Sequence, residues 1–176
     1  MKLLSVPYFL RMLDRIRTAS PEDAEQIRSI YDPIVRETAI SFELEPPGLD
    51  ETRRRIEHTM KSFPWLVWDD AGELNGYAYA TRFRDRPAYD RSTEISVYVE
   101  ESVRRRGVAR GLIERLTDDL RRREFATAIA GITLPNPASV ALFESLGFTH
   151  VGVFERVGYK FGTWHDVGFW QRHLLE

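Results

Sequence analysis

The chain has 176 residues and a formal net charge of −2, with 43% hydrophobic and 30% charged residues, a mixture typical of a globular protein with a substantial core. The small net charge argues against nucleic-acid binding through bulk charge, and no apolar run is long enough to span a membrane. The absence of cysteine excludes disulfides, thiolate metal ligands and a cysteine nucleophile, and is consistent with a cytoplasmic protein.

Residues 1–14 precede the regular pattern and are predicted to be an N-terminal extension. Their short apolar run is a poor signal peptide, because Arg11 and Asp14 follow it and no small-x-small cleavage site appears. Two alternatives stay open: an added arm, or a start codon upstream of the true start at Met12. No repeat or linker divides the remainder, so residues 15–176 are predicted to form a single domain.

The elements from residue 16 to residue 99 predict an α/β fold. A strand at residues 16–18 precedes a helix that Ser20 caps, with Pro21 in its first position. A second helix is predicted from Asp50, after a loop that ends in Pro46-Pro47-Gly48. Strands are then predicted at residues 65–68, 74–82 and 93–99.

The segment after these strands is the most informative of the chain. It consists of Arg104, Arg105, Arg106, Gly107, Val108, Ala109, Arg110 and Gly111, and it opens a helix with apolar residues at helical spacing. The first turn of a helix has unpaired N–H groups and a positive dipole end, and the small residues here leave room for an anion to approach. The segment therefore predicts a pyrophosphate site, although a basic helix start on a solvated surface is the alternative. It is neither a Walker loop nor a dinucleotide fingerprint.

The last third predicts three further strands and a short helix. A buried strand is expected at residues 126–132, and Asn136 caps a helix that stops at Gly147. The final strands are expected at residues 149–156 and 167–173.

Several of these segments resemble a known family. The spacing Arg104-x-x-Gly107-x-Ala109 resembles the acetyl-CoA loop of the GNAT superfamily of N-acetyltransferases, and residues 132–148 and 158–171 resemble its phosphinothricin acetyltransferase branch. The resemblance implies the GNAT fold, a mostly antiparallel sheet that is splayed at the cofactor strand and flanked by helices. It also implies a homodimeric enzyme that transfers acetyl from acetyl-CoA to a small amino-acid-like amine.

The resemblance also assigns catalytic and cofactor residues. Glu94 matches the general base of this branch; the alternative is a strand-end carboxylate paired with Arg91. The backbone of Val97, Tyr98 and Val99 is expected to bind the pantetheine arm, as a short strand would, while the side chains pack in the core. Asn136 is expected to cap its helix and to lie near the same arm.

Phe42, Arg84 and Trp164 are the candidates for the acceptor site. A bidentate arginine suits a carboxylate or phosphinate, although a solvated loop charge is the alternative for Arg84. Trp164 is expected to complete the pocket wall. Two alternatives stay open: it does so within its own chain, or across a dimer interface. His165 is expected to be a packed or hydrogen-bonded histidine.

The chain departs from the family pattern at Phe143, where the branch often has a histidine that acts as a general acid. The role would then be absent, or filled by water, Tyr98 or Tyr159. A non-catalytic acyl-CoA sensor, which the missing proton donor would suit, is one alternative to the small-molecule enzyme, and a protein or peptide N-acetyltransferase with the same chemistry is the other. No metal is expected, because His58, His150 and His173 lack metal-ligand spacing.

Overall fold

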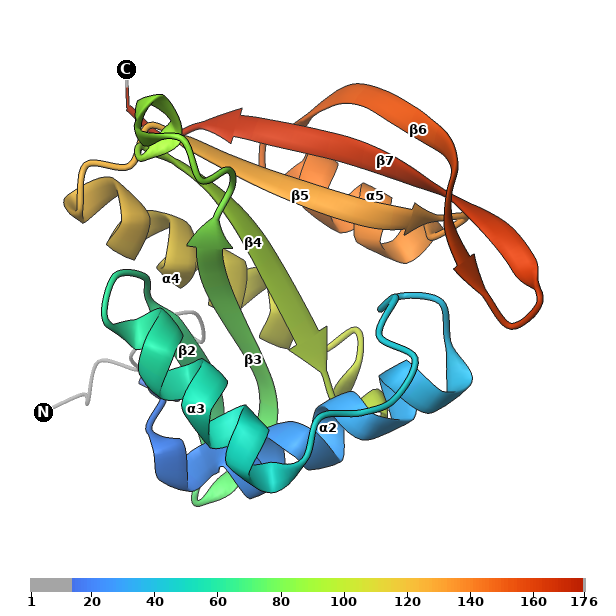
Figure 1. The fold of residues 1–176 in the computed structure, drawn as a ribbon. Helices are drawn as coiled ribbons and strands as arrows, with labels where there is room; N and C mark the ends of the chain where they lie inside the picture. The colour runs from blue at the N-terminus through green and yellow to red at the C-terminus, as the bar shows by residue number, and fades with distance from the viewer. Residues whose placement is uncertain (1–13, 176) are drawn as a thin grey trace, which may run out of the picture.

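The computed structural model describes residues 14–175, so the predicted extension lies outside the described residues except for Asp14. Seven strands form one sheet in the order β1-β2-β3-β4-β5-β7-β6, and every neighbouring pair is antiparallel except β4 and β5 (Figure 1). The strands are β1 (Ile16–Thr18), β2 (Trp65–Asp70), β3 (Glu73–Arg82), β4 (Ser92–Val99), β5 (Thr127–Leu134), β6 (Thr149–Lys160) and β7 (Thr163–His173). The α-helices are α2 (Ala24–Glu37), α3 (Leu49–Met60), α4 (Val108–Arg122) and α5 (Pro137–Ser145). Short 3-10 turns lie at η1 (Pro21–Asp23), η2 (Pro87–Tyr89) and η3 (Glu101–Val103).

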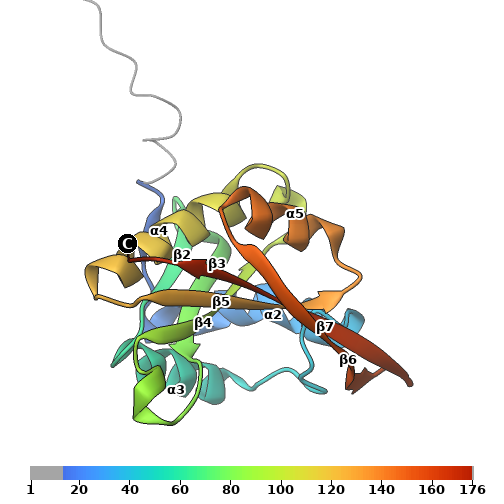
Figure 2. The ribbon, with the colours of Figure 1, turned by 90° about the horizontal axis from the view of Figure 1, so that it is seen from above.

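Side chains alternate between the two faces of the sheet, and each face is covered by helices. Seen from above, α4 and α5 lie on one side of the sheet, and α2 and α3 lie on the other (Figure 2). Leu66 and Ile95 pack with Leu112 of α4, whereas Val67 and Tyr77 pack with α2 and α3. The chain therefore forms two cores, one on each face.

The sheet is splayed between β4 and β5. Both strands have eight residues, yet they pair only where residues 92–94 meet residues 127–129. Beyond Glu94 the two strands diverge and form no further pairs. The family resemblance implied such a splay. Backbone groups of β4 on this side are thus left without a ladder partner in β5.

Most predicted boundaries lie within two residues of the structure, and larger differences occur in two places. The first helix begins as the 3-10 turn η1, in which Ser20 and Asp23 form a capping box, and the α-helix starts only at Ala24. The last two strands are longer than predicted and meet in a two-residue turn, where Phe161 and Gly162 have φ of 51° and 73°. Their added residues expose Val157, Tyr159 and Trp164, whereas the buried positions are Gly158 and Lys160. The apolar alternation that marks a half-buried strand is therefore missing there.

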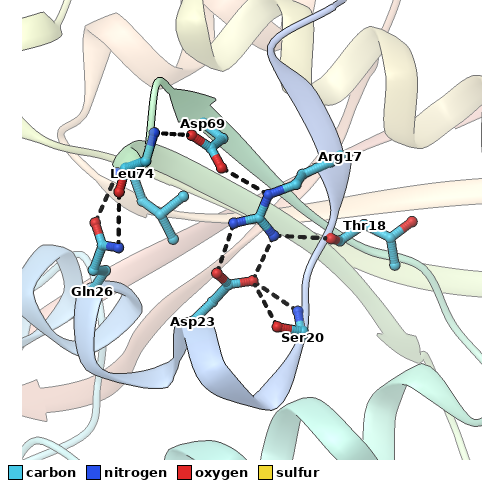
Figure 3. A network of polar contacts seen from close by, with 8 residues as sticks. Arg17, Thr18, Ser20, Asp23, Gln26, Asp69 and Leu74 are labelled. Carbon is cyan, nitrogen blue, oxygen red and sulfur yellow. Dashed lines mark hydrogen bonds and ion pairs between the residues drawn. The ribbon is translucent and has the colours of Figure 1, made fainter.

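A polar network fixes the N-terminal strand to its surroundings (Figure 3). The Arg17 guanidinium donates to both carboxylate oxygens of Asp23 at 2.8 Å and to Asp69 at 2.8 Å. The Ser20 amide donates to the same Asp23 carboxylate at 2.8 Å. Burial alone raises the pKa of Asp23, but Arg17 and Ser20 outweigh it, so this pKa lies below its ordinary value of 3.8.

Replacing Asp23 by asparagine should lower the free energy of unfolding by about 2 kcal/mol at neutral pH, because Arg17 loses its buried partner although it is itself half exposed. The lowered pKa means that wild type gains this stability above pH 3.8 and loses it as the pH falls further. The difference between the two proteins in urea unfolding should therefore shrink in acid. Asp70→Asn, which breaks a half-exposed pair with Arg15, is the control and should cost about 0.5 kcal/mol. Equal losses in the two variants would contradict the prediction.

Candidate functional site

The arginine-rich segment forms an anion cradle at the start of α4. Gly107 precedes the helix with φ of 86°, in the left-handed region that favours glycine. The amide of Gly111 donates to the Gly107 carbonyl at 2.9 Å, so the amides of the three residues between them lie in the unpaired first turn. Arg104 and Arg105 are exposed beside this turn. Unpaired amides, the helix dipole and arginines together suit a phosphate or pyrophosphate.

A cavity of about 510 Å³ runs from this cradle to β4 and α5. It collects every predicted cofactor-binding residue except Arg106: Val97, Tyr98, Val99, Arg104, Arg105, Gly107, Val108, Ala109, Arg110 and Asn136. Asn136 also caps α5, accepting from the Ser139 amide at 3.1 Å. The Arg110 side chain is held by Ser145 at 2.6 Å, so it bridges α4 and α5 rather than standing free.

A second, smaller cavity of about 60 Å³ lies inside the splay. It is lined by Val97 and Tyr98 from β4, by Gly131 from β5, and by Asn136 and Phe143 from the α5 segment. Asn136 and β4 line both cavities, so the two spaces are neighbours. An elongated ligand that lies in the cradle can thus reach the unpaired backbone of β4.

Glu94 lies where β4 and β5 stop pairing. It pairs with Ile129, and a Cβ placed on Gly131 would lie 3.3 Å from its Oε1, so the carboxylate extends over a residue with no side chain. Burial raises the pKa of Glu94 above its ordinary value of 4.5, and Arg84 lowers it to a lesser degree. No hydrogen bond or ion pair to this carboxylate occurs among residues 14–175. Arg91, the alternative partner, pairs with Glu124 instead, at 3.4 Å.

Arg84 lies in the exposed loop after β3. Its guanidinium stacks over the Phe83 ring at 4.2 Å and donates to the Phe83 carbonyl at 2.8 Å. Both residues line a cavity of about 360 Å³ together with Ile129 and Phe169. Ile129 is the residue with which Glu94 pairs, so this cavity and the Glu94 carboxylate are neighbours. The Arg84 guanidinium is close enough for its charge to lower the pKa of Glu94.

Phe42 lies in the loop after α2 and packs against the β6–β7 hairpin. Its ring lies over Gly158 and 6.0 Å from the His165 ring. Trp164 is adjacent to His165 in a strand, so it points to the other face of the hairpin, where it packs on Tyr159 at 5.1 Å. Within one chain the structure therefore does not bring Trp164 together with Phe42.

Phe143 is buried in the core on the α4 and α5 side, with its ring edge-on to Phe148 at 5.1 Å. Of the two tyrosines considered for the proton donor, Tyr98 lines the same small cavity as Phe143, and burial raises its pKa well above 10. Its ring packs edge-on against Tyr31 at 5.0 Å. Tyr159 is exposed on the hairpin. Tyr98 is thus the one of the two that adjoins the splay.

Within residues 14–175, no group of three or more His, Asp or Glu side chains is arranged to hold a metal ion. No helix in this part of the chain is both long and apolar enough to cross a membrane.

Sequence reasoning did not assign a role to Gly131, Gly158 or Lys160. Gly131 makes room for the Glu94 carboxylate, and the other two contact the loop that carries Phe42. The contacts of Gly158 and Lys160 join segments more than a hundred residues apart, and Gly131 lies on a different strand from Glu94, so neither spacing nor periodicity in the sequence indicates them. The only signal was that Gly158 and Lys160 fall in the segment that resembles the family.

Comparisons of the sequence and of the structure with known proteins all identify acetyltransferases. The family model described as an acetyltransferase (GNAT) domain matches residues 16–168. A phosphinothricin N-acetyltransferase of Streptomyces viridochromogenes is 37% identical over 89% of this chain and 86% of its own length. An L-methionine sulfoximine/L-methionine sulfone acetyltransferase of Salmonella typhimurium is 35% identical over 92% of this chain and 95% of its own. The solved structure of a GNAT superfamily phosphinothricin acetyltransferase from Sinorhizobium meliloti in complex with AcCoA superposes with a TM-score of 0.86 at 33% identity, covering 90% of this chain and 86% of that one.

Proposed function

This chain belongs to the GNAT family of acetyltransferases, and from that premise we propose that it transfers acetyl from acetyl-CoA to the amine of a small amino-acid-like substrate. The observation that carries the proposal is the position of Glu94, a carboxylate with a raised pKa at the point where the sheet opens. Phosphinothricin, methionine sulfoximine and methionine sulfone are the acceptors to try first, because relatives carry these names. The proposal includes residues 15–176 as the catalytic domain and a cytoplasmic location.

The cradle and the splay fit acetyl-CoA as a substrate. The amides at the start of α4 and the arginines of residues 104–106 would bind the pyrophosphate. The backbone of Val97, Tyr98 and Val99 would bind the amides of the pantetheine arm, with Asn136 beside it. This arrangement brings the thioester carbonyl to the β4 amides, where an N–H group can polarise it.

The acceptor amine would approach from the Glu94 side. Arg84 would bind its carboxylate or phosphinate, and Phe42 would form part of the pocket wall. Glu94 would take one proton from the acceptor ammonium, directly or through a water molecule, and the free amine would attack the thioester carbonyl within a ternary complex. A thiol is acidic enough to leave as thiolate, so Phe143 is compatible with this chemistry. Tyr98 is the residue proposed to protonate the thiolate, and the second proton that the nitrogen loses as the intermediate collapses would restore the Tyr98 hydroxyl, so that the amide and the CoA thiol form and Glu94 then releases one proton to solvent.

Thiol release from acetyl-CoA tests the function directly. We expect turnover with at least one of the three small acceptors and none with a peptide that has a free N-terminus. Turnover with the peptide alone would favour a protein N-acetyltransferase. Tight acetyl-CoA binding without turnover on any amine would favour an acyl-CoA sensor and overturn the proposal.

Replacing Arg84 by methionine should lower kcat/KM for the amine by about 10–100-fold, because a charge-assisted contact to the acceptor is lost. Arg84 also lowers the pKa of Glu94, so its removal should raise that pKa. The base works when deprotonated, and the acidic limb of the kcat/KM profile should therefore move to higher pH. Arg86→Met, an exposed arginine of the same loop, is the control and should leave the limb in place. A limb that does not move in Arg84→Met would contradict the prediction.

We also propose that two copies form a homodimer through β6. This strand lies at the edge of the sheet and exposes large apolar side chains, namely Val151, Val153, Phe154, Val157 and Tyr159. Trp164 is half exposed on the same hairpin, whereas Trp170 is buried and belongs to the core of one chain. An edge strand with this surface favours pairing with a second copy. Light scattering should give a dimer mass, and a monomer at assay concentrations would contradict the proposal.

A further inference from the structure

Lys160 is a buried lysine that the proposed chemistry does not use. Its side chain is 3% exposed, and its Nζ donates to the carbonyls of Val35 and Ser41, at 2.7 Å each. No carboxylate forms an ion pair with it among the described residues. Burial of a cation is costly unless its charge is compensated, and here the two carbonyls compensate it together with the Phe161 ring, 5.0 Å from Nζ, and the charge of Glu43.

The two carbonyls belong to the end of α2 and to the loop that follows it. Val35 lies in the last turn of α2, where free carbonyls and the helix dipole favour a cation. Ser41 precedes Phe42 in the loop. One ammonium group therefore ties the end of a helix to the residue next to Phe42, and it does so from β6.

Gly158 contacts the same loop two residues away on the same face of β6. A Cβ placed there would lie 2.5 Å from Cε1 and 2.6 Å from Cε2 of Phe42, closer than real contacts allow. The Phe42 ring thus rests on bare backbone. Both ribbon views show the tip of the β6–β7 hairpin beside the loop after α2 (Figures 1 and 2).

The loop also reaches the site. Ile40 lines both the cavity at the cradle and the smaller cavity inside the splay. Ser41 and Glu43 bond the Tyr31 hydroxyl at 2.7 and 3.2 Å. Residues 40–43 therefore span from the splay to the hairpin, with Phe42 at the hairpin end.

We propose that Gly158 and Lys160 are positioning residues for the acceptor amine: they hold residues 40–43 in place, so that Phe42 stays fixed in the wall of the acceptor pocket. The inference rests on the proposed function. Displacing the loop should weaken binding of the amine more than binding of acetyl-CoA, because acetyl-CoA is also held by the cradle at residues 104–111, although Ile40 lines its cavity.

Gly158→Ala is the principal variant, and Gly48→Ala is its control, since a Cβ at Gly48 meets nothing within 4 Å and Gly48 lines none of the cavities described above. We expect the amine KM to rise at least about 10-fold in Gly158→Ala, and the acetyl-CoA Kd to rise by a smaller factor. In a Phe42→Ala background the alanine at residue 158 should have no further effect, because the clash is gone. Equal KM values for the two alanine variants, or an unchanged effect in the Phe42→Ala background, would overturn the proposal.

Lys160→Met keeps the length of the side chain and removes both hydrogen bonds. It should raise the amine KM more than it lowers kcat, and amide exchange of residues 38–43 should accelerate while residues 104–111 stay unchanged. Faster exchange without a change in amine KM would overturn the positioning role. If wild type accepts no amine, the proposed function fails, and the exchange data still decide whether Gly158 and Lys160 hold the loop. If neither variant changes that exchange, the positioning role fails whatever the substrate is.

Discussion

Replacing Glu94 by glutamine should reduce kcat by about 10²–10⁴-fold at neutral pH, the usual loss on removal of a general base. Glutamine keeps the size of the side chain over Gly131 but cannot accept the proton. The loss should fall on turnover and not on acetyl-CoA affinity, because the carboxylate lies at the mouth of the splay, away from the cradle.

The difference in activity between wild type and Glu94→Gln should depend on pH in a defined direction. Burial raises the pKa of Glu94 above 4.5 despite the opposing effect of Arg84, and only the deprotonated form can act as base. Wild-type kcat/KM should therefore rise with pH through an acidic limb that Glu94→Gln lacks. The deficit of the variant should shrink at high pH, where more of the acceptor is already a free amine.

The assignment of Glu94 as the general base can be tested against a second carboxylate variant. Glu124→Gln changes an exposed carboxylate that pairs with Arg91, and it should turn over at the wild-type rate. If Glu94→Gln matched that rate at neutral pH, with chemistry shown to limit turnover, Glu94 would not be the base.

Local patterns in the sequence predicted the parts of the site that local structure builds. Glycine and small residues at a helix start predicted the cradle, and the structure gathers all of the predicted cofactor-binding residues except Arg106 around one cavity. Asn136 was predicted as a helix cap and accepts from the Ser139 amide. The cradle and the cap each depend on residues within a few positions of one another, whereas the places of Val97, Tyr98 and Val99 beside them came from the family resemblance.

The acceptor side could not be predicted in the same way. Phe42 depends on Gly158, and the loop depends on Lys160, so the relevant partners are separated by more than a hundred residues. The hairpin that carries these partners was predicted too short, because its buried positions are Gly158 and Lys160 and its large apolar side chains are exposed, so no apolar period marks its buried face. The face of the hairpin to which Trp164 points depends on how β6 pairs with β7, and it could not be predicted from the sequence either.

Replacing Gly107 by valine should raise the Kd of acetyl-CoA by more than about 100-fold, equivalent to about 2.7 kcal/mol. Gly107 has φ of 86°, a conformation in which a β-branched residue is strained, so valine would shift the turn that presents the first amides of α4. Gly72→Val is the matched control, because Gly72 has φ of 96° in the β2–β3 turn, away from the cradle. Both variants should lose stability, but only Gly107→Val should lose acetyl-CoA binding in calorimetry. Unchanged affinity in folded Gly107→Val would place the pyrophosphate elsewhere, since the strain would then have disturbed the cradle without disturbing the ligand.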